Sequence, residues 1–225
     1  MKRPARLKEI LLCCLLAAAQ GCASESRNAN ESPPISGGHG SGNPALAPGG
    51  DPIEAIAKSM RAQMDVRSFR VRMEFSYAGN DNARTVEFVA PDRFHMISDK
   101  NEVYIIGPDT FMKDEKGRWQ KVPMDVNAMI QSFRDPTIID EVRRSASAKF
   151  IGPDVLDGAP MLVYEYSMSN AFGTNSTSTT KSWIAESDGL PRRLEIDGEI
   201  NSVKARAVNT YYDYNADIRI EPPIK

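Results

Sequence analysis

Few residues of this chain are of the types that do nucleophilic or metal chemistry. All three cysteines lie at or before position 22, and the region from 51 to 225 contains a single histidine, His95. Cys–His nucleophile pairs and thiolate or multi-histidine metal sites therefore cannot form in that region. The sequence also lacks G-x-S-x-G, H-E-x-x-H and glycine-rich phosphate-loop motifs. We expect a protein that is not an enzyme and that has no metal site and no cofactor.

The remaining polar candidates are typical of solvated positions. His95 lies between Phe94 and Met96 in an alternating segment, which predicts an outward polar position on a strand. The adjacent acids Asp114-Glu115 fall in a turn, where solvated carboxylates are usual, and His39 lies among glycines. None of these residues indicates a catalytic site.

The N-terminus has the pattern of a secretory signal that ends in a cysteine. A basic segment, residues 2–8, precedes an apolar run, residues 10–19. A helix of that length spans about 15 Å, half of the roughly 30 Å of a bilayer core. The following Gly21-Cys22 resembles the bacterial lipobox. This resemblance implies that residues 1–21 are a lipoprotein signal peptide and that diacylglycerol alkylates the Cys22 thiol. Plain secretion after an A-x-G site remains the alternative.

Lipid attachment also explains why Cys22 has no partner. No other cysteine follows it, so a disulfide within the mature chain is excluded. Two or three acyl chains would anchor the protein stably to a membrane. The next residue is Ala23 and not an aspartate retention signal. In a host with two membranes we therefore expect an outer-membrane anchor, with the protein facing the periplasm.

Residues 22–50 follow the signal as a tether. They are rich in serine, glycine, asparagine and proline and contain almost no large apolar side chain. Such a segment buries too little surface to fold, and its expected reach is roughly 30 Å. The chain has no basic block, so nucleic acid is not an expected partner.

Residues 51–225 are the size of one domain. The segment 51–54, Asp-Pro-Ile-Glu, predicts a helix start with an N-cap acceptor, a first-turn proline and a glutamate three residues later. From Ser68 the apolar period changes to two, which predicts antiparallel strands with a turn at 79–82. Two apolar helices are expected at 126–133 and 137–143. Strands then resume from 149, and the last is expected at 218–220.

These elements predict an α+β fold. We expect a curved, mostly antiparallel sheet of roughly ten strands, an open half-barrel covered by an N-terminal helix and a mid-chain helical lid. The concave face of such a sheet is too wide for its own side chains to fill, so a covered apolar hollow is the expected binding site. Ordinary core packing remains the alternative. The candidate cavity residues alternate on the first two strands or repeat on the two mid-chain helices: Phe69, Val71, Met73, Phe75, Val86, Phe88, Met129, Ile130, Phe133, Ile138 and Ile139.

Several segments resemble the lipoprotein-carrier superfamily, which includes LolA, LolB, the LppX-type lipoproteins and RseB. Val86–Phe94, Val103–Gly107 and Gly117–Trp119 are similar to its progression of an apolar strand, P-D-R-F, I-G and G-x-W. Trp183–Leu194 is similar to its W-I-D-x-x-x-G-L-P-x-R segment, with Ala185 in place of the aspartate. The resemblance implies an open half-barrel with a helical lid over an acyl-binding cavity. The lipobox favours a membrane-anchored member.

The expected function is that of a cell-envelope lipoprotein. Its half-barrel cavity would bind acyl chains or another amphipathic ligand, for transfer of lipid or lipoprotein between membranes. The alternative is an envelope interaction or sensor module, in which the groove binds a protein segment or a lipid without transport. Expected partners are thus an acyl-chain ligand, the membrane through the anchor, and an envelope protein in the second case.

Overall fold

The computed structural model describes residues 50–123, 135–169 and 176–224, and within them eleven strands and two helices. The helices are α2 (Pro52–Met64) and α4 (Thr137–Ser145). The strands are β1 (Ser68–Tyr77), β2 (Asn80–Val89), β3 (Arg93–Ser98), β4 (Glu102–Ile106), β5 (Asp109–Lys113), β6 (Trp119–Val122), β7 (Ser147–Leu156), β8 (Ala159–Ser169), β9 (Ser176–Ala185), β10 (Pro191–Ile200) and β11 (Val203–Tyr212).

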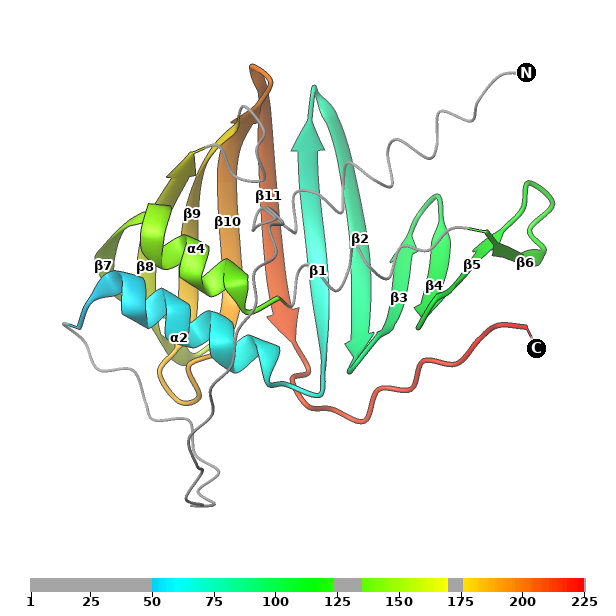
Figure 1. Cartoon of the computed structure of the whole chain (residues 1–225), viewed down its shortest axis with the longest axis horizontal. Coiled ribbons are helices and arrows are strands. Elements are labelled where there is room, and N and C mark those ends of the chain that lie inside the picture. The colour runs from blue at the N-terminus through cyan, green and yellow to red at the C-terminus, as the bar shows by residue number, and fades with distance from the viewer. Residues whose placement is uncertain (1–49, 124–134, 170–175, 225) are drawn as a thin grey trace, which may run out of the picture.

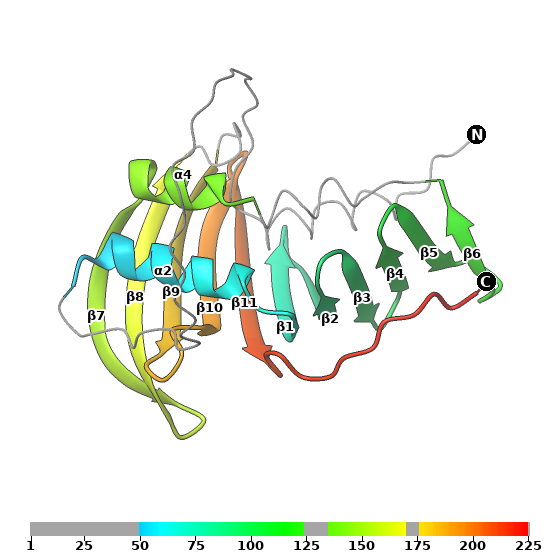
Figure 2. The ribbon, with the colours of Figure 1, turned by 60° about the horizontal axis from the view of Figure 1, so that its bottom comes forward.

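All eleven strands form one antiparallel sheet that stays open. Their order is β6-β5-β4-β3-β2-β1-β11-β10-β9-β8-β7, so β6 and β7 are the two edges (Figure 1). The first and last strands pair in the middle, with Val71 opposite Tyr211 and Phe75 opposite Ala207. The sheet is curved and is not closed (Figure 2). The predicted α+β half-barrel is confirmed, with one strand more than expected.

Helix α2 begins where the sequence predicts. The Asp51 side chain accepts a hydrogen bond from the backbone N–H of Ile53 at 2.9 Å, and Pro52 occupies the first turn. The cap satisfies one of the amide groups that a helix N-terminus leaves unpaired. The acid three residues after the cap, Glu54, receives hydrogen bonds from the Arg143 side chain of α4. The residue read as part of a capping box thus joins the two helices.

Both helices pack on the same face of the sheet, which we call the inner face. They lie over the half formed by β7 to β11 (Figures 1 and 2). Helix α4 buries Ile138, Ile139 and Val142, each at most 1 % exposed. The cluster between the helices and the sheet contains Ala55, Ile56, Val142, Leu162, Tyr164, Tyr166, Met168 and Ile184. This half of the sheet is a conventional core.

Two expectations about local structure need correction. Ile218 and Ile220 are buried as an alternating pair, but the segment is not a strand. The carbonyl of Ile220 accepts a hydrogen bond from Arg93 Nη1 at 2.7 Å, a side-chain contact in place of a ladder bond. The two prolines that follow have no N–H to donate to a ladder. The β1–β2 turn is formed by Ala78 and Gly79, which both have positive φ, and not by residues 79–82.

The structure also bears on membrane association. Within the described residues, neither helix is long and apolar enough to cross a bilayer. The expected helix at 126–133 and the expected signal peptide and tether lie outside the described residues.

Candidate functional site on the inner face of the sheet

Strand alternation places the apolar side chains of β1 and β2 on the inner face. Phe69, Val71 and Met73 point inward, whereas the residues between them on β1 are charged. Directly paired residues of antiparallel strands share a face. Val86 and Phe88 of β2 pair with Val71 and Phe69, so they extend the same apolar surface.

An aromatic row crosses three strands at one end of this surface. Phe88 is fully buried, and its ring centroid lies 5.0 Å from that of Phe69 and 4.9 Å from that of Phe94. Ile105 of β4 is paired with Phe94 and continues the row. Rings at these separations attract one another beyond their shared burial.

A second row, next to the aromatic one, contains thioethers. Met96 of β3 is paired with Val86, Val103 of β4 with Met96, and Met112 of β5 with Val103. Val103 is 5 % exposed. Flexible thioethers adapt to apolar partners of different shape. The two rows form a continuous apolar surface from β1 to β5, and no described helix lies over β2 to β6 (Figure 2).

The predicted cavity residues fall into three groups. Phe69, Val71, Met73, Val86 and Phe88 lie together on this surface. Phe75 lies further along β1, and its ring stacks on that of Tyr77 at 6.3 Å. Ile138 and Ile139 are buried in α4, whose main contacts are with α2 and β8. Met129, Ile130 and Phe133 lie outside the described residues.

Two tyrosines mark the boundary between the apolar surface and the helix-covered half. Tyr211 is paired with Val71, and its ring lies 5.8 Å from that of Phe69. Burial raises the pKa of Tyr211 to about 12. The Tyr214 hydroxyl donates to the carbonyl of Pro191 at 2.7 Å and accepts from Gln63 of α2 at 3.4 Å. These contacts hold the end of α2 against β10 and the chain that follows β11.

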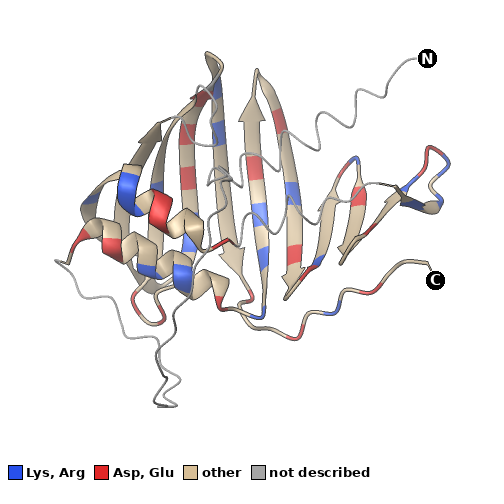
Figure 3. Cartoon of the chain, viewed as in Figure 1, with Lys and Arg blue, Asp and Glu red and all other residues tan. Residues whose placement is uncertain are grey.

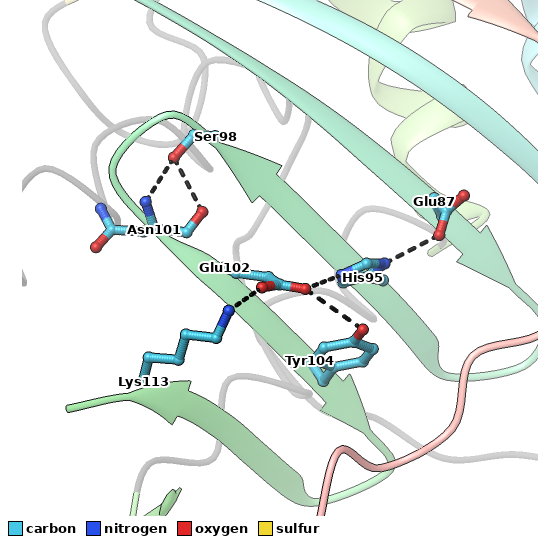
Figure 4. Close-up of polar contacts among 7 residues, drawn as sticks. All are labelled: Glu87, His95, Ser98, Asn101, Glu102, Tyr104 and Lys113. Carbon is cyan, nitrogen blue, oxygen red and sulfur yellow. Dashed lines mark hydrogen bonds and ion pairs between the residues drawn. The ribbon is translucent and has the colours of Figure 1, made fainter. Parts of the chain in front are cut away.

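The opposite, outer face of β2 to β5 is polar. His95 lies there, as alternation predicts, but its side chain is only 12 % exposed. Its Nδ1 lies 3.0 Å from a carboxylate oxygen of Glu87, and its Nε2 lies 3.0 Å from one of Glu102 (Figure 4). The Tyr104 ring stacks on the imidazole at 4.0 Å, and Lys113 binds Glu102. Because carboxylates only accept, both contacts are hydrogen bonds only when both ring nitrogens carry protons.

This network keeps its carboxylates ionised. Burial raises the pKa of Glu87, but hydrogen bonds from His95 and Arg70 outweigh burial, and the net shift is downward. The hydrogen bond from Lys113, assisted by His95, lowers the pKa of Glu102. No set of three metal-binding side chains converges within the described residues. The arrangement links β2, β3, β4 and β5 on the outer face of the sheet.

Charge is distributed unequally between the two faces. Charged residues recur along β1, β2, β10 and β11 (Figure 3). On the outer face of β1 they are paired: Arg70 contacts Glu87 and Asp213, both at 2.7 Å, and Arg72 contacts Glu74 at 3.0 Å. The inner face of β1 to β5 is predominantly apolar.

Reasoning from sequence missed part of this surface. Phe94, Met96, Val103, Ile105 and Met112 belong to it but were not among the candidates. The signal was present, because each lies at a period-two position of a short strand. What periodicity did not show was that β3, β4 and β5 share an inner face with β1 and β2.

The structure defines the class of protein as an antiparallel half-barrel with an apolar inner face. Lipoprotein LppX of Mycobacterium tuberculosis has this fold, with a TM-score of 0.59 and 13 % sequence identity over 75 % of this chain and 97 % of that chain. LprF from Mycobacterium bovis superposes with a TM-score of 0.52 and 14 % identity over 80 % of this chain and 99 % of that one. No family model matches the sequence, and no curated protein is similar to it at a significant level.

These likenesses agree with the fold that the motifs predicted. At such low identity the two solved structures show that the architecture is shared, and the match covers 97 % and 99 % of their chains. The resemblance that was based on short segments such as Val86–Phe94 and Trp183–Leu194 is therefore confirmed at the level of fold.

Proposed function

We propose that this protein is a lipid-anchored protein of the cell envelope that binds acyl chains, or another amphipathic molecule, on the inner face of its half-barrel. The observation that carries this proposal is the apolar surface of β1 to β5, where aromatic rings and thioethers adjoin and no described helix packs over β2 to β6. An acyl chain needs no reacting group, because burial of about 25 cal/mol per Å² supplies the affinity. Transfer of the ligand between membranes would likewise need no chemistry.

The anchor belongs to the same proposal. One of the two proteins that share the fold is itself a lipoprotein. Here the lipid would be carried by Cys22, with residues 22–50 as the tether and residues 51–225 as the binding domain. Ala23 favours the outer membrane in a host with two membranes.

The anchor is tested by the variant Cys22→Ser. The wild-type protein should partition into the detergent phase, whereas the variant should remain in the aqueous phase after export. A variant that still partitions into detergent would contradict lipidation at Cys22. Fractionation of the two membranes then tests the location, and recovery mainly in the inner membrane would contradict the expectation from Ala23.

Ligand binding is tested with a matched pair of substitutions and a fluorescent fatty acid, cis-parinaric acid. Val86→Thr changes the apolar surface of β2, and Val142→Thr makes the same change in the core beneath α4. Both should reduce stability, but only Val86→Thr should weaken binding. Native mass spectrometry of gently purified protein should also detect bound lipid. Absence of bound lipid together with no binding of cis-parinaric acid would overturn the proposal.

Transfer is tested separately from binding. Protein loaded with a labelled lipid should deliver it to acceptor vesicles faster than the lipid exchanges without protein. If the protein binds lipid but does not accelerate exchange, the protein would be a lipid-binding module without transport.

A further inference from the structure

One cross-strand row of the inner face is polar. Next to the row of Val71 and Val86 lies a row in which Asn209 of β11, Met73 of β1, Arg84 of β2 and Ser98 of β3 are successive partners. Because paired residues share a face, Arg84 and Asn209 lie on the same side of the sheet as the phenylalanines. They flank Met73, and with strands roughly 4.8 Å apart their Cα atoms are roughly 10 Å from each other.

Arg84 differs from the other arginines of β1 and β2. Arg70 and Arg72 lie on the outer face and are paired with carboxylates. Arg84 is half-buried, and it makes no ion pair or hydrogen bond with any residue that the structure describes. A guanidinium that is partly removed from water is unfavourable without an anion, and its planar donors match carboxylate and phosphate groups.

Asn209 supplies an independent observation. It is 1 % exposed and lies two residues before Tyr211 on the same face of β11. Its carbonyl oxygen, Oδ1, has no hydrogen-bond partner among the described residues. Buried polar atoms are nearly always partnered, so this acceptor needs a donor that the described residues do not supply.

We propose that Arg84 and Asn209 bind the head group of the amphiphile whose acyl chains lie on the apolar rows. Arg84 would bind an anionic carboxylate or phosphodiester, and Asn209 Oδ1 would accept a hydrogen bond from a hydroxyl of the same head group. The ligand class is therefore an anionic lipid with a hydroxylated head group. This inference rests on the proposed function.

The row also orients the ligand. The polar row lies on the side of the β1–β2 turn, at Ala78-Gly79, and the aromatic row of Phe69 and Phe88 lies on the opposite side of the row of Val71. The head group would thus lie toward the β1–β2 turn and the acyl chains toward the β2–β3 connection.

The charge preference is tested in the Cys22→Ser background with two probes that share one acyl chain, cis-parinaric acid and its methyl ester. The protein should bind the acid about tenfold to a hundredfold more tightly than the ester, as expected for a charge-assisted hydrogen bond. Arg84→Gln should abolish that preference, mainly by weakening binding of the acid. Arg84→Lys should keep part of it, and the outer-face control Arg72→Gln should keep all of it.

The hydroxyl preference is tested by displacement of the bound probe with phosphatidylglycerol and with phosphatidylmethanol, which differ in the glycerol hydroxyls. Wild-type protein should prefer phosphatidylglycerol, and Asn209→Leu should bind both equally. Equal binding of acid and ester by wild-type protein would overturn the role of Arg84 but leave the proposed function intact. Failure to bind either probe would instead overturn the proposed function.

Discussion

Glu54 of α2 and Arg143 of α4 lie 89 residues apart in sequence but form a bidentate ion pair. Arg143 Nε and Nη2 donate to the two carboxylate oxygens at 2.8 and 2.9 Å. Bidentate geometry fixes the relative orientation of two groups better than a single contact does. The pair therefore sets how the second helix lies across the first.

We expect Glu54→Gln to loosen the packing of α4 on α2. The hydrogen bond from Arg143 lowers the pKa of Glu54 below its ordinary value near 4.5. A lowered folded-state pKa stabilises the protein above that value, and the contribution is lost as the pH falls below it. Amide hydrogen exchange in α4 at pH 7 should be faster in the variant. The control is Glu141→Gln, whose partner Arg144 lies in the same helix. Equal exchange in both variants would contradict the interhelical role.

His95→Gln should make the protein less stable at neutral pH and its stability less dependent on pH in the acid range. The substitution removes the His95 hydrogen bond, one of the contacts that lower the pKa of Glu87, so that pKa rises. Ionised Glu87 then contributes less to the free energy of unfolding at neutral pH. A smaller part of that free energy is therefore lost as the pH falls. Urea unfolding between pH 3 and pH 7 should show a lower midpoint at neutral pH and a shallower acid limb. An unchanged acid limb would mean that the network does not act through Glu87.

Tyr214→Phe should destabilise the protein by about 1–3 kcal/mol, because the Pro191 carbonyl loses its donor. In the wild-type protein the Tyr214 hydroxyl oxygen lies 2.7 Å from the carbonyl oxygen of Pro191. Tyr212→Phe is the matched control, since Tyr212 is 38 % exposed two residues earlier. Denaturant unfolding of both variants measures the difference, and equal stabilities would refute it.

Gly198→Ala should destabilise the protein by about 1–3 kcal/mol, the usual effect of overpacking. A Cβ at this position would lie 2.6 Å from the backbone carbonyl oxygen of Thr177 on β9, so the two strands must separate. Gly50→Ala is the control, because a Cβ there meets nothing within 4 Å. Calorimetric unfolding should show a clear fall in melting temperature for Gly198→Ala alone.

The local elements were predictable because their signals are local. The Asp51 cap is specified by neighbouring residues, and the alternation of Phe69, Val71 and Met73 identifies both the strand and its inner face. The short motifs supported the half-barrel, because they resemble those of a family that has this architecture.

Long-range relationships were not predictable in the same way. The amphipathic pattern of Ile138 and Ile139 shows that a helix packs on something, but it does not show that the main contacts are with α2 and β8. Glu54 fits a capping box by its spacing, and only the folded chain brings Arg143 to it. The alternation of β2 predicts that Arg84 lies on the inner face. Only the folded structure shows that it has no ion-pair or hydrogen-bond partner among the described residues.

The central pairing of β1 with β11 has a consequence for how the chain folds. Nine of the ten strand pairings join consecutive strands and form by short loop closures, whereas β1 must pair with a strand made after all the others. Loop closure over such a separation is slow, and an unpaired strand edge is prone to aggregate meanwhile. The two meanders, β1 to β6 and β7 to β11, would form independently, and the pairing of β1 with β11 would form last. A factor that shields the edge of β1 at Arg70–Tyr77 would therefore raise folding yield more than one acting on any other strand.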